Sequence, residues 1–291
     1  MRNAAKSGDA VRASLPPILI LLVALLAYAN AWPNSLVHDD KLYHGPERFV
    51  ALSNIPRYFT ESALATSGIS EPFYRPLLLL SITLDTRVHG DWVAGYHITN
   101  LILHALVSIL LFVFLWQLLS HLHVTPRANT IAAMAAALIY AAHPINTETV
   151  NSIFNRSEMM VGLWILAGLV WFLRNLRTRP AQGWTGLGVA YLFALFSKES
   201  AIVLPGIAAT LAFVLTPGTF SDRFRKSLPV LWLLVPAALY LLMRSAAISG
   251  GAGGEGTDES QMLLSERLIN VFGYWYEAGR MWIWPHPLSV V

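Results

Sequence analysis

The sequence predicts an all-α protein that crosses a membrane several times. Of its 291 residues, 55% are hydrophobic and only 13% are charged, whereas soluble domains usually carry about 25% charged residues. The apolar residues also gather in runs that approach or reach the roughly 17–25 residues that a helix needs to cross a bilayer. Most of the protein surface is therefore expected to face hydrocarbon rather than water.

The apolar runs place the predicted spans along the chain. They lie at about 15–32, 95–119, 129–143, 158–173, 186–202, 203–217 and 228–246. The last part of this series holds one long apolar stretch, 186–217, which is broken by Ser197-Lys198-Glu199-Ser200 and predicts a tight turn at a membrane face. A further stretch at about 263–284 contains Trp275, Trp282 and Trp284, and it fits either an interfacial helix or an eighth span.

The basic residues orient these spans. They cluster before the first run and after the second, fourth and sixth: Arg2, Lys6, Arg12, Arg127, Arg174, Arg177, Arg179, Arg223, Arg225 and Lys226. Only Arg156 and Lys198 occur in the hairpins on the opposite side. Because cytoplasmic loops are enriched in Lys and Arg, the clustered side is predicted to be cytoplasmic. Short clusters between apolar runs suit anionic lipid headgroups, so the net charge of +3 does not indicate nucleic acid.

Two outer segments remain, at about 33–94 and 247–262. In the first, the spacing of Phe49, Leu52, Tyr58 and Phe59 predicts a helix over Pro46 to Glu61 that lies on the membrane. Residues 76–84 are apolar but too short to span. In the second, the run from Gly250 to Gly254 predicts a mobile loop.

The N-terminus fits two interpretations. Basic residues, an apolar core at 18–29 and the small residues Ala27, Ala29 and Ala31 resemble a cleavable signal peptide. The same segment also suits a retained first span. The chain has no cysteine, which excludes disulfides, a thiolate nucleophile and Cys-ligated metal.

Four polar features lie at the outer ends of the predicted spans. The first is His38-Asp39-Asp40, where adjacent carboxylates either cap a helix or work on a substrate. The second is Arg75, within Phe73-Tyr74-Arg75-Pro76-Leu77, whose planar guanidinium suits phosphate but also suits snorkelling to headgroups.

The third feature is the segment His143-Pro144-Ile145-Asn146-Thr147-Glu148, followed by Asn155 to Met160, in which Glu158 begins a span and also suits the helix dipole. The fourth is Lys198-Glu199, which alternatively forms a simple neutralising pair. Together, these features predict an outer-face cavity with carboxylates, an arginine and a lysine. Such a cavity suits a lipid phosphate donor in the outer leaflet.

The order of these motifs resembles one family. They are Val37-His38-Asp39-Asp40, Tyr74-Arg75-Pro76-Leu77, His97 to Asn100 with His104, His143-Pro144 with Thr147-Glu148, Arg156-Ser157-Glu158, Ser197-Lys198-Glu199, and Trp284-Pro285 with Pro287-Leu288-Ser289. Across nearly the whole chain, the series is similar to the transmembrane and tetratricopeptide-repeat O-mannosyltransferases and their bacterial relatives, which are members of the GT-C glycosyltransferase superfamily.

The resemblance implies a GT-C-like helical bundle with juxtamembrane helices in the first outer loop. It implies further spans and C-terminal tetratricopeptide repeats, neither of which appears up to Val291. Residues 1–291 are then expected to be the N-terminal portion of the transmembrane domain, as a fragment or as a shortened homologue. The resemblance also favours retention of the first span. It also implies a polyprenyl- or dolichyl-phosphate-linked sugar as donor. The membrane is then the bacterial inner membrane, with the site on its periplasmic face, or the endoplasmic reticulum, with the site in the lumen.

The chemistry expected from this resemblance is inverting sugar transfer to a protein or other hydroxyl acceptor. Asp39 is expected to accept the hydroxyl proton, with Asp40 as its neighbour or alternative. Arg75 and Lys198 are expected to bind the donor phosphate. Glu158, Glu148 and His143 are expected to orient sugar or acceptor, and the chemistry requires neither a metal nor another cofactor.

Two other classes of function stay open on the sequence. A transporter or flippase also places charges along a substrate path, although no pair of interrupted helices repeats between two halves of the chain. A non-catalytic membrane scaffold descended from such enzymes is the second alternative.

Overall fold

The computed structural model describes residues 2–36, 39–43, 49, 51–62, 73–249 and 264–285. Its helices are α1 (Arg2–Ala27), α2 (Asp40–Tyr43), α3 (Ile55–Tyr58), α4 (Pro76–His89), α5 (Val93–His121), α6 (Pro126–Ala142), α7 (Thr147–Asn151), α8 (Arg156–Asn175), α9 (Pro180–Ser197), α10 (Leu204–Leu215), α11 (Phe220–Ser227), α12 (Leu234–Ser249) and α13 (Leu264–Ile283). Short 3-10 turns are η2 (Leu52–Asn54), η3 (Pro144–Asn146), η4 (Glu199–Val203) and η5 (Leu228–Leu233). No strand occurs among these residues, so the all-α prediction is confirmed.

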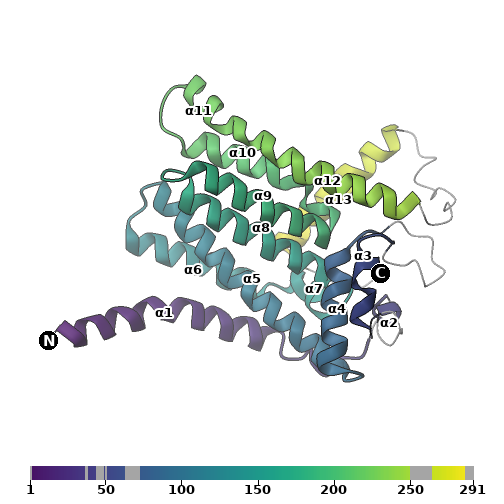
Figure 1. The fold of residues 1–291 in the computed structure, drawn as a ribbon. Helices are drawn as coiled ribbons and strands as arrows, with labels where there is room; N and C mark the ends of the chain where they lie inside the picture. Colours follow the sequence, from purple (N-terminus) through teal and green to yellow (C-terminus); the bar gives the residue numbers. More distant parts are fainter. Residues whose placement is uncertain are drawn as a thin grey trace.

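The long helices lie side by side and the short ones gather at the two ends. In Figure 1, α5, α6, α8, α9, α10 and α12 run in roughly the same direction, and α1 packs along α5 and α6. Helices α2, α3, α4 and α7 lie at one end of this bundle, which we call the α4 end, and α11 lies at the other, the α11 end. Helices α8 and α9 approach closely, since a Cβ atom on Gly168 would lie 2.7 Å from that of Ala190.

Helices occur at each predicted span, and some are long enough to cross a membrane alone. Three described segments have the length and apolar composition of a span: Val93–His121, Arg156–Asn175 and Phe220–Ile248. The pair Pro126–Ala142 and Pro144–Asn151 also qualifies, with a 48° bend, and Leu15–Ala27 and Glu199–Leu215 are shorter apolar helices. The polytopic prediction is confirmed.

Helix α9 corrects the boundaries of one predicted span. It occupies Pro180–Ser197 rather than 186–202, because Pro180 supplies its first turn and the chain becomes extended at Lys198. The predicted break at 197–200 is confirmed, since η4 starts anew at Glu199.

The first outer segment packs on α4. The predicted membrane-lying helix over 46–61 is corrected in its described part: Ala51 is not helical, and Leu52 to Tyr58 forms two short turns rather than part of one continuous helix. The buried Tyr58 hydroxyl lies 2.7 Å from Thr83 Oγ1 on α4, so the face with Tyr58 covers protein rather than lipid. Helix α4 itself is 14 residues long, too short to span, and it ends at Gly90, whose φ of 58° favours glycine.

Some expectations fall outside the described residues. These are His38, most of the outer segment 247–262, and Pro287-Leu288-Ser289. Helix α13 forms most of the tryptophan-containing stretch predicted at about 263–284, and Trp275 and Trp282 on it are exposed. Helix α13 has the length of a span but is not among the described segments apolar enough to be one, so these observations favour the interfacial helix.

Candidate functional site at the α4 end

The helix connections at the α4 end bring the sequence-predicted residues into one region (Figure 1). Asp39 precedes α2 and Asp40 begins it; Arg75 directly precedes α4; His143 follows α6; Glu148 lies in α7; Glu158 lies in the first turn of α8; and Lys198 follows α9. Because successive long helices run back and forth, alternate connections of the chain meet at this end.

The two adjacent carboxylates have different surroundings. Asp40 is fully buried, and its Oδ1 accepts hydrogen bonds from Ser152 Oγ and from the Phe154 amide, both at 2.9 Å. Asp39 is exposed. Asp40 therefore anchors α2 to the loop between α7 and α8, and Asp39 presents its carboxylate to the outside.

Glu148 joins the same network. Its Oε1 accepts a hydrogen bond from the side-chain Nδ2 of Asn155 at 2.9 Å. The backbone N–H of Asn155 donates to Ser152 Oγ at 3.2 Å. Ser152 Oγ in turn donates to Asp40. The loop between α7 and α8 thus connects Glu148 to the acidic motif through two intervening residues.

Arg75 lies against two aromatic rings that contact each other edge to face, Phe73 and Phe154, beside this loop. Its guanidinium carbon lies 4.6 Å from the ring centre of Phe73 and 5.0 Å from that of Phe154. Its Nη2 donates to Glu199 Oε1 at 3.0 Å and its Nε to Oε2 at 3.4 Å, and the side chain is only 3% exposed. The predicted snorkelling alternative is corrected, because the guanidinium is buried in protein.

Tyr74 fixes the backbone next to Arg75. It is 1% exposed, and burial raises the pKa of its phenol to about 12. The phenol therefore keeps its proton near neutral pH and donates it to the Phe59 carbonyl at 2.9 Å. This contact ties the approach to α4 to the end of α3, and so holds Arg75 at the bundle end.

Lys198 and Glu199 do not neutralise each other. Lys198 Nζ forms an ion pair with Glu158, to which Ser200 Oγ also donates at 3.5 Å, whereas Glu199 pairs with Arg75. The alternative that Lys198 and Glu199 form a simple neutralising pair is therefore wrong. Both glutamates are about 40% exposed, against 20% for Lys198 and 3% for Arg75. The cations lie underneath and the carboxylates outside, with Lys198 the more accessible cation.

His143 occupies a different part of this end. Its Nδ1 accepts from the Ile145 amide at 3.2 Å, so Nε2 carries the proton, and it lies 3.2 Å from the Trp282 carbonyl. The ring also lies against the Trp282 ring, with 5.4 Å between centres, and Tyr28 OH donates to the His143 carbonyl. These contacts tie the α6–α7 turn to α1 and α13 rather than to the two ion pairs.

The sequence did not reveal the residue at the centre of the buried network, Arg156. It is fully buried; its Nε donates to Asn100 Oδ1 at 2.6 Å and its Nη2 lies 2.6 Å from Asp85 Oδ2. Asn100 Nδ2 donates to the carbonyls of Val150 and Ser152 at 3.0 and 2.9 Å. Asp85, an acid within the apolar α4, is the signal that sequence reasoning passed over, because such an acid needs a cationic partner.

The geometry thus gives an exposed carboxylate, Asp39, next to the buried Asp40 that the α7–α8 loop holds. Two ion pairs lie at the same end, Arg75–Glu199 and Lys198–Glu158. Phe154 is the meeting point, because its amide holds Asp40 and its ring covers Arg75. No group of three or more metal-binding side chains lies within the described ranges.

An apolar helical bundle with helices long enough to cross a membrane defines a multi-pass membrane protein. Its candidate site lies at the polar, charge-rich α4 end. The family model for dolichyl-phosphate-mannose-protein mannosyltransferases matches residues 79–245. This match covers more than half of the chain, and the chain belongs to that family.

Curated relatives agree with this assignment. The chain is 26% identical to Protein O-mannosyl-transferase TMTC4 of Homo sapiens over 272 residues. This alignment covers 82% of this chain and 36% of the relative. It is 22% identical to Protein O-mannosyl-transferase F38B6.6 of Caenorhabditis elegans, over 94% of this chain and 37% of the relative. With Protein O-mannosyl-transferase Tmtc2 of Drosophila melanogaster it shares 31% identity, over 62% of this chain and 20% of the relative. The match covers between a fifth and little more than a third of these proteins' length, and no solved structure matches the chain.

Proposed function

We propose that the chain transfers a sugar, with inversion, from a polyprenyl- or dolichyl-phosphate donor to a hydroxyl at the α4 end. The names of the family and of the relatives, protein mannosyltransferase and Protein O-mannosyl-transferase, support mannose as the sugar and a protein hydroxyl as the acceptor. The observation that carries the proposal is the exposed Asp39 beside Asp40, whose partner Phe154 also covers Arg75, at the end where Glu158 of α8 holds Lys198.

Asp39 is the proposed general base. A Ser or Thr hydroxyl is a weak nucleophile, and a carboxylate that accepts its proton as the new bond forms lowers the barrier. Asp40 is less suited to this role, because its Oδ1 already accepts two hydrogen bonds and the side chain is buried. Asp40 instead holds the neighbouring Asp39 in place.

The two cations are the proposed partners of the donor phosphate. When the acceptor oxygen attacks the anomeric carbon, the sugar–oxygen bond to phosphate breaks and the phosphate gains one negative charge. Lys198 and Arg75 are placed to stabilise that charge, with Lys198 the first to be reached since it is more exposed. Phosphate binding then competes with Glu158 and Glu199 for these cations.

The remaining acids and His143 are proposed to orient substrates. Glu158 is 41% exposed beside Lys198, so a sugar hydroxyl near the phosphate can donate to it. Glu148 and His143 lie farther along the same end, on α7 and before it, where an acceptor peptide would approach. We propose that this end faces the periplasm, or the lumen of the endoplasmic reticulum.

The test is sugar transfer by membranes that contain the full chain. Membranes receive radiolabelled dolichyl-phosphate mannose and a Ser/Thr-containing peptide, and label is measured in peptide and in lipid. The proposal expects labelled peptide from the wild-type chain and from Asp91→Asn, which changes an exposed acid, but not from Asp39→Asn. Donor that binds without any transfer would favour a scaffold, and movement of labelled lipid across the bilayer without covalent product would favour a flippase.

A further inference from the structure

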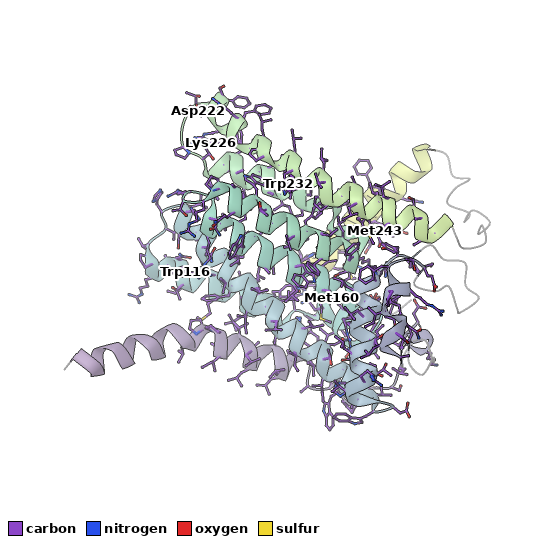
Figure 2. The ribbon with its side chains drawn as sticks, viewed as in Figure 1. Trp116, Met160, Asp222, Lys226, Trp232 and Met243 are labelled. Atoms are coloured by element: carbon purple, nitrogen blue, oxygen red, sulfur yellow. The ribbon has the colours of Figure 1, made fainter. Side chains whose placement is uncertain are left out.

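A cavity opens at the α11 end, away from the candidate site. It has a volume of about 780 Å³ and lies between the α8–α9 turn and the α10–α11 turn. Figure 2 shows Asp222 and Lys226, two of its lining residues, at this end, while Met160 on α8 lies toward the other. None of the residues proposed for sugar transfer lines it.

The rim of this cavity is cationic. Arg177 comes from the α8–α9 turn, and Arg225 and Lys226 come from the last turn of α11. All three side chains are exposed, and none takes part in an ion pair identified within the described ranges. Three like charges around one cavity repel one another, and an anion bound between them relieves that repulsion.

The one acid on the rim is already engaged. Asp222 Oδ2 accepts from the Thr219 amide at 3.0 Å and from Thr219 Oγ1 at 2.7 Å, in the capping box that begins α11. Its carboxylate stabilises the helix start and leaves the cavity with an excess of two positive charges from the rim residues.

The floor of the cavity is apolar. Trp184 is 4% exposed and packs on Phe172 with 4.6 Å between ring centres, and Leu215 is 6% exposed. A freely soluble phosphate does not need such a floor. A molecule with both a phosphate and hydrocarbon uses both parts of the site.

Helix α11 places this cavity at a lipid surface. Phe220 and Phe224 are 74% and 55% exposed and lie nearly parallel, with 6.5 Å between ring centres, while Arg225 and Lys226 occupy other positions of the same short helix. Exposed aromatic rings beside Lys and Arg are typical of helices that lie in the membrane interface. Acyl chains can then pass along the rings while the headgroup enters the cavity.

The geometry points to a binding site for the phosphate of an anionic phospholipid at the α11 end, held by Arg177, Arg225 and Lys226. Guanidinium groups bind phosphate oxygens with paired donors, and basic pockets between membrane helices on the cytoplasmic side suit anionic headgroups. The clustering of basic residues predicts that this end is the cytoplasmic one.

Lipid retention by the purified full chain tests this site. Native mass spectrometry in non-ionic detergent compares phosphatidylglycerol with phosphatidylcholine of identical acyl chains. Phosphatidylglycerol is expected to bind about tenfold or more tightly, and the variant Arg177→Gln/Arg225→Gln/Lys226→Gln is expected to lose that preference. The control Arg127→Gln/Arg174→Gln removes exposed cations that do not line the cavity, and it should keep the preference.

Several outcomes would overturn the proposal. Equal retention of the two lipids by the wild-type chain is one, and this comparison requires no variant to fold. Undiminished preference in the triple variant is another. Competition arms with inorganic phosphate and glycerol 3-phosphate distinguish the sources of phosphate, since full displacement of phosphatidylglycerol by either soluble anion would assign the site to a soluble ligand. If the triple variant does not fold, Arg225→Gln alone is expected to weaken phosphatidylglycerol binding and Arg225→Lys to retain most of it.

Discussion

The Arg156 guanidinium and the Asp85 carboxylate form an ion pair of 2.6 Å in which the side chains are 0% and 8% exposed. Arg156 begins α8 and Asp85 belongs to α4, so the pair fastens the short helix of the first outer segment to the spanning bundle. Because the loop that holds Asp40 and Arg75 directly precedes Arg156, the geometry of the candidate site depends on this contact.

Removal of one partner is expected to destabilise the protein strongly. Arg156→Met keeps the length of the side chain but leaves Asp85 buried without its cation, which typically costs about 3–5 kcal/mol of the free energy of unfolding. Thermal unfolding in detergent, followed by tryptophan fluorescence, measures the change. As a control, Arg87→Met removes an exposed cation from α4, the helix that carries Asp85. Its free energy of unfolding should stay within about 0.5 kcal/mol of the wild-type value. The double variant Arg156→Met/Asp85→Asn should recover part of the loss; no recovery would show that the charge pair is not the cause.

The adjacent carboxylates are expected to separate activity from stability. Asp39→Asn removes a proton acceptor from an exposed position, so sugar transfer should fall by roughly 100-fold or more while thermal unfolding is unchanged. Asp40→Ala removes the acceptor of the Ser152 and Phe154 hydrogen bonds and should lower the free energy of unfolding by about 1–3 kcal/mol.

Asp40→Asn is the matched comparison, because an amide oxygen can still accept both bonds. It should fold like the wild-type chain and retain most transfer. Loss of transfer in Asp40→Asn with full activity in Asp39→Asn would exchange the two roles, and full activity in both variants and in their combination would remove this motif from the chemistry.

The sequence was sufficient to predict the helical fold, because apolar runs of spanning length have few alternatives in a bilayer. Turn positions followed from local chemistry, as at Lys198, where charged residues interrupt an apolar stretch. The packing of Tyr58 on α4 was not predictable, since an amphipathic helix has the same periodicity whether its apolar face meets lipid or protein.

The sequence was sufficient to predict which residues belong to the candidate site, but not which of them form ion pairs with one another. Asp39, Arg75 and Lys198 stood out because charges are costly near hydrocarbon. Their partners depend on which helices are neighbours in space, as the pairing of Arg75 with Glu199, 124 positions along the chain, illustrates. Asp85 carried a local signal, but its partner Arg156 looked like a residue of an exposed hairpin.

The predicted orientation can be tested with single cysteines, because the chain has none of its own. Thr60 lies at the α4 end and Ser221 at the α11 end, and both are exposed. In sealed cells, Thr60→Cys should react with an impermeant maleimide from outside and Ser221→Cys only after permeabilisation. Labelling of Ser221→Cys in intact cells, with Thr60→Cys protected, would reverse the orientation.

Both cations are expected to contribute to donor binding. Lys198→Ala removes the more accessible cation, and Arg75→Ala removes one that also holds Glu199. Each should weaken binding of dolichyl-phosphate mannose by about 1.5–3 kcal/mol, measured by titration of the purified chain. Arg57→Ala, an exposed change at the same end, is the control and should bind normally. Arg75→Lys should recover only part of the loss, because an ammonium lacks the planar pair of donors.

Variants of the glutamates distinguish phosphate binding from a purely structural role of Arg75. Glu199→Gln keeps the shape of the partner but releases the guanidinium from a competing carboxylate. If Arg75 binds the donor phosphate, this variant should bind donor as tightly as the wild-type chain or more tightly, while Arg75→Ala loses binding. If Arg75 serves only to hold the turn after α9, Glu199→Gln should lose donor binding and thermal stability together with Arg75→Ala, because either change breaks the same contact. Glu158→Gln is the corresponding test for Lys198, because it removes the carboxylate that pairs with that cation. If Glu158 orients the sugar, this variant should keep donor binding but transfer less sugar.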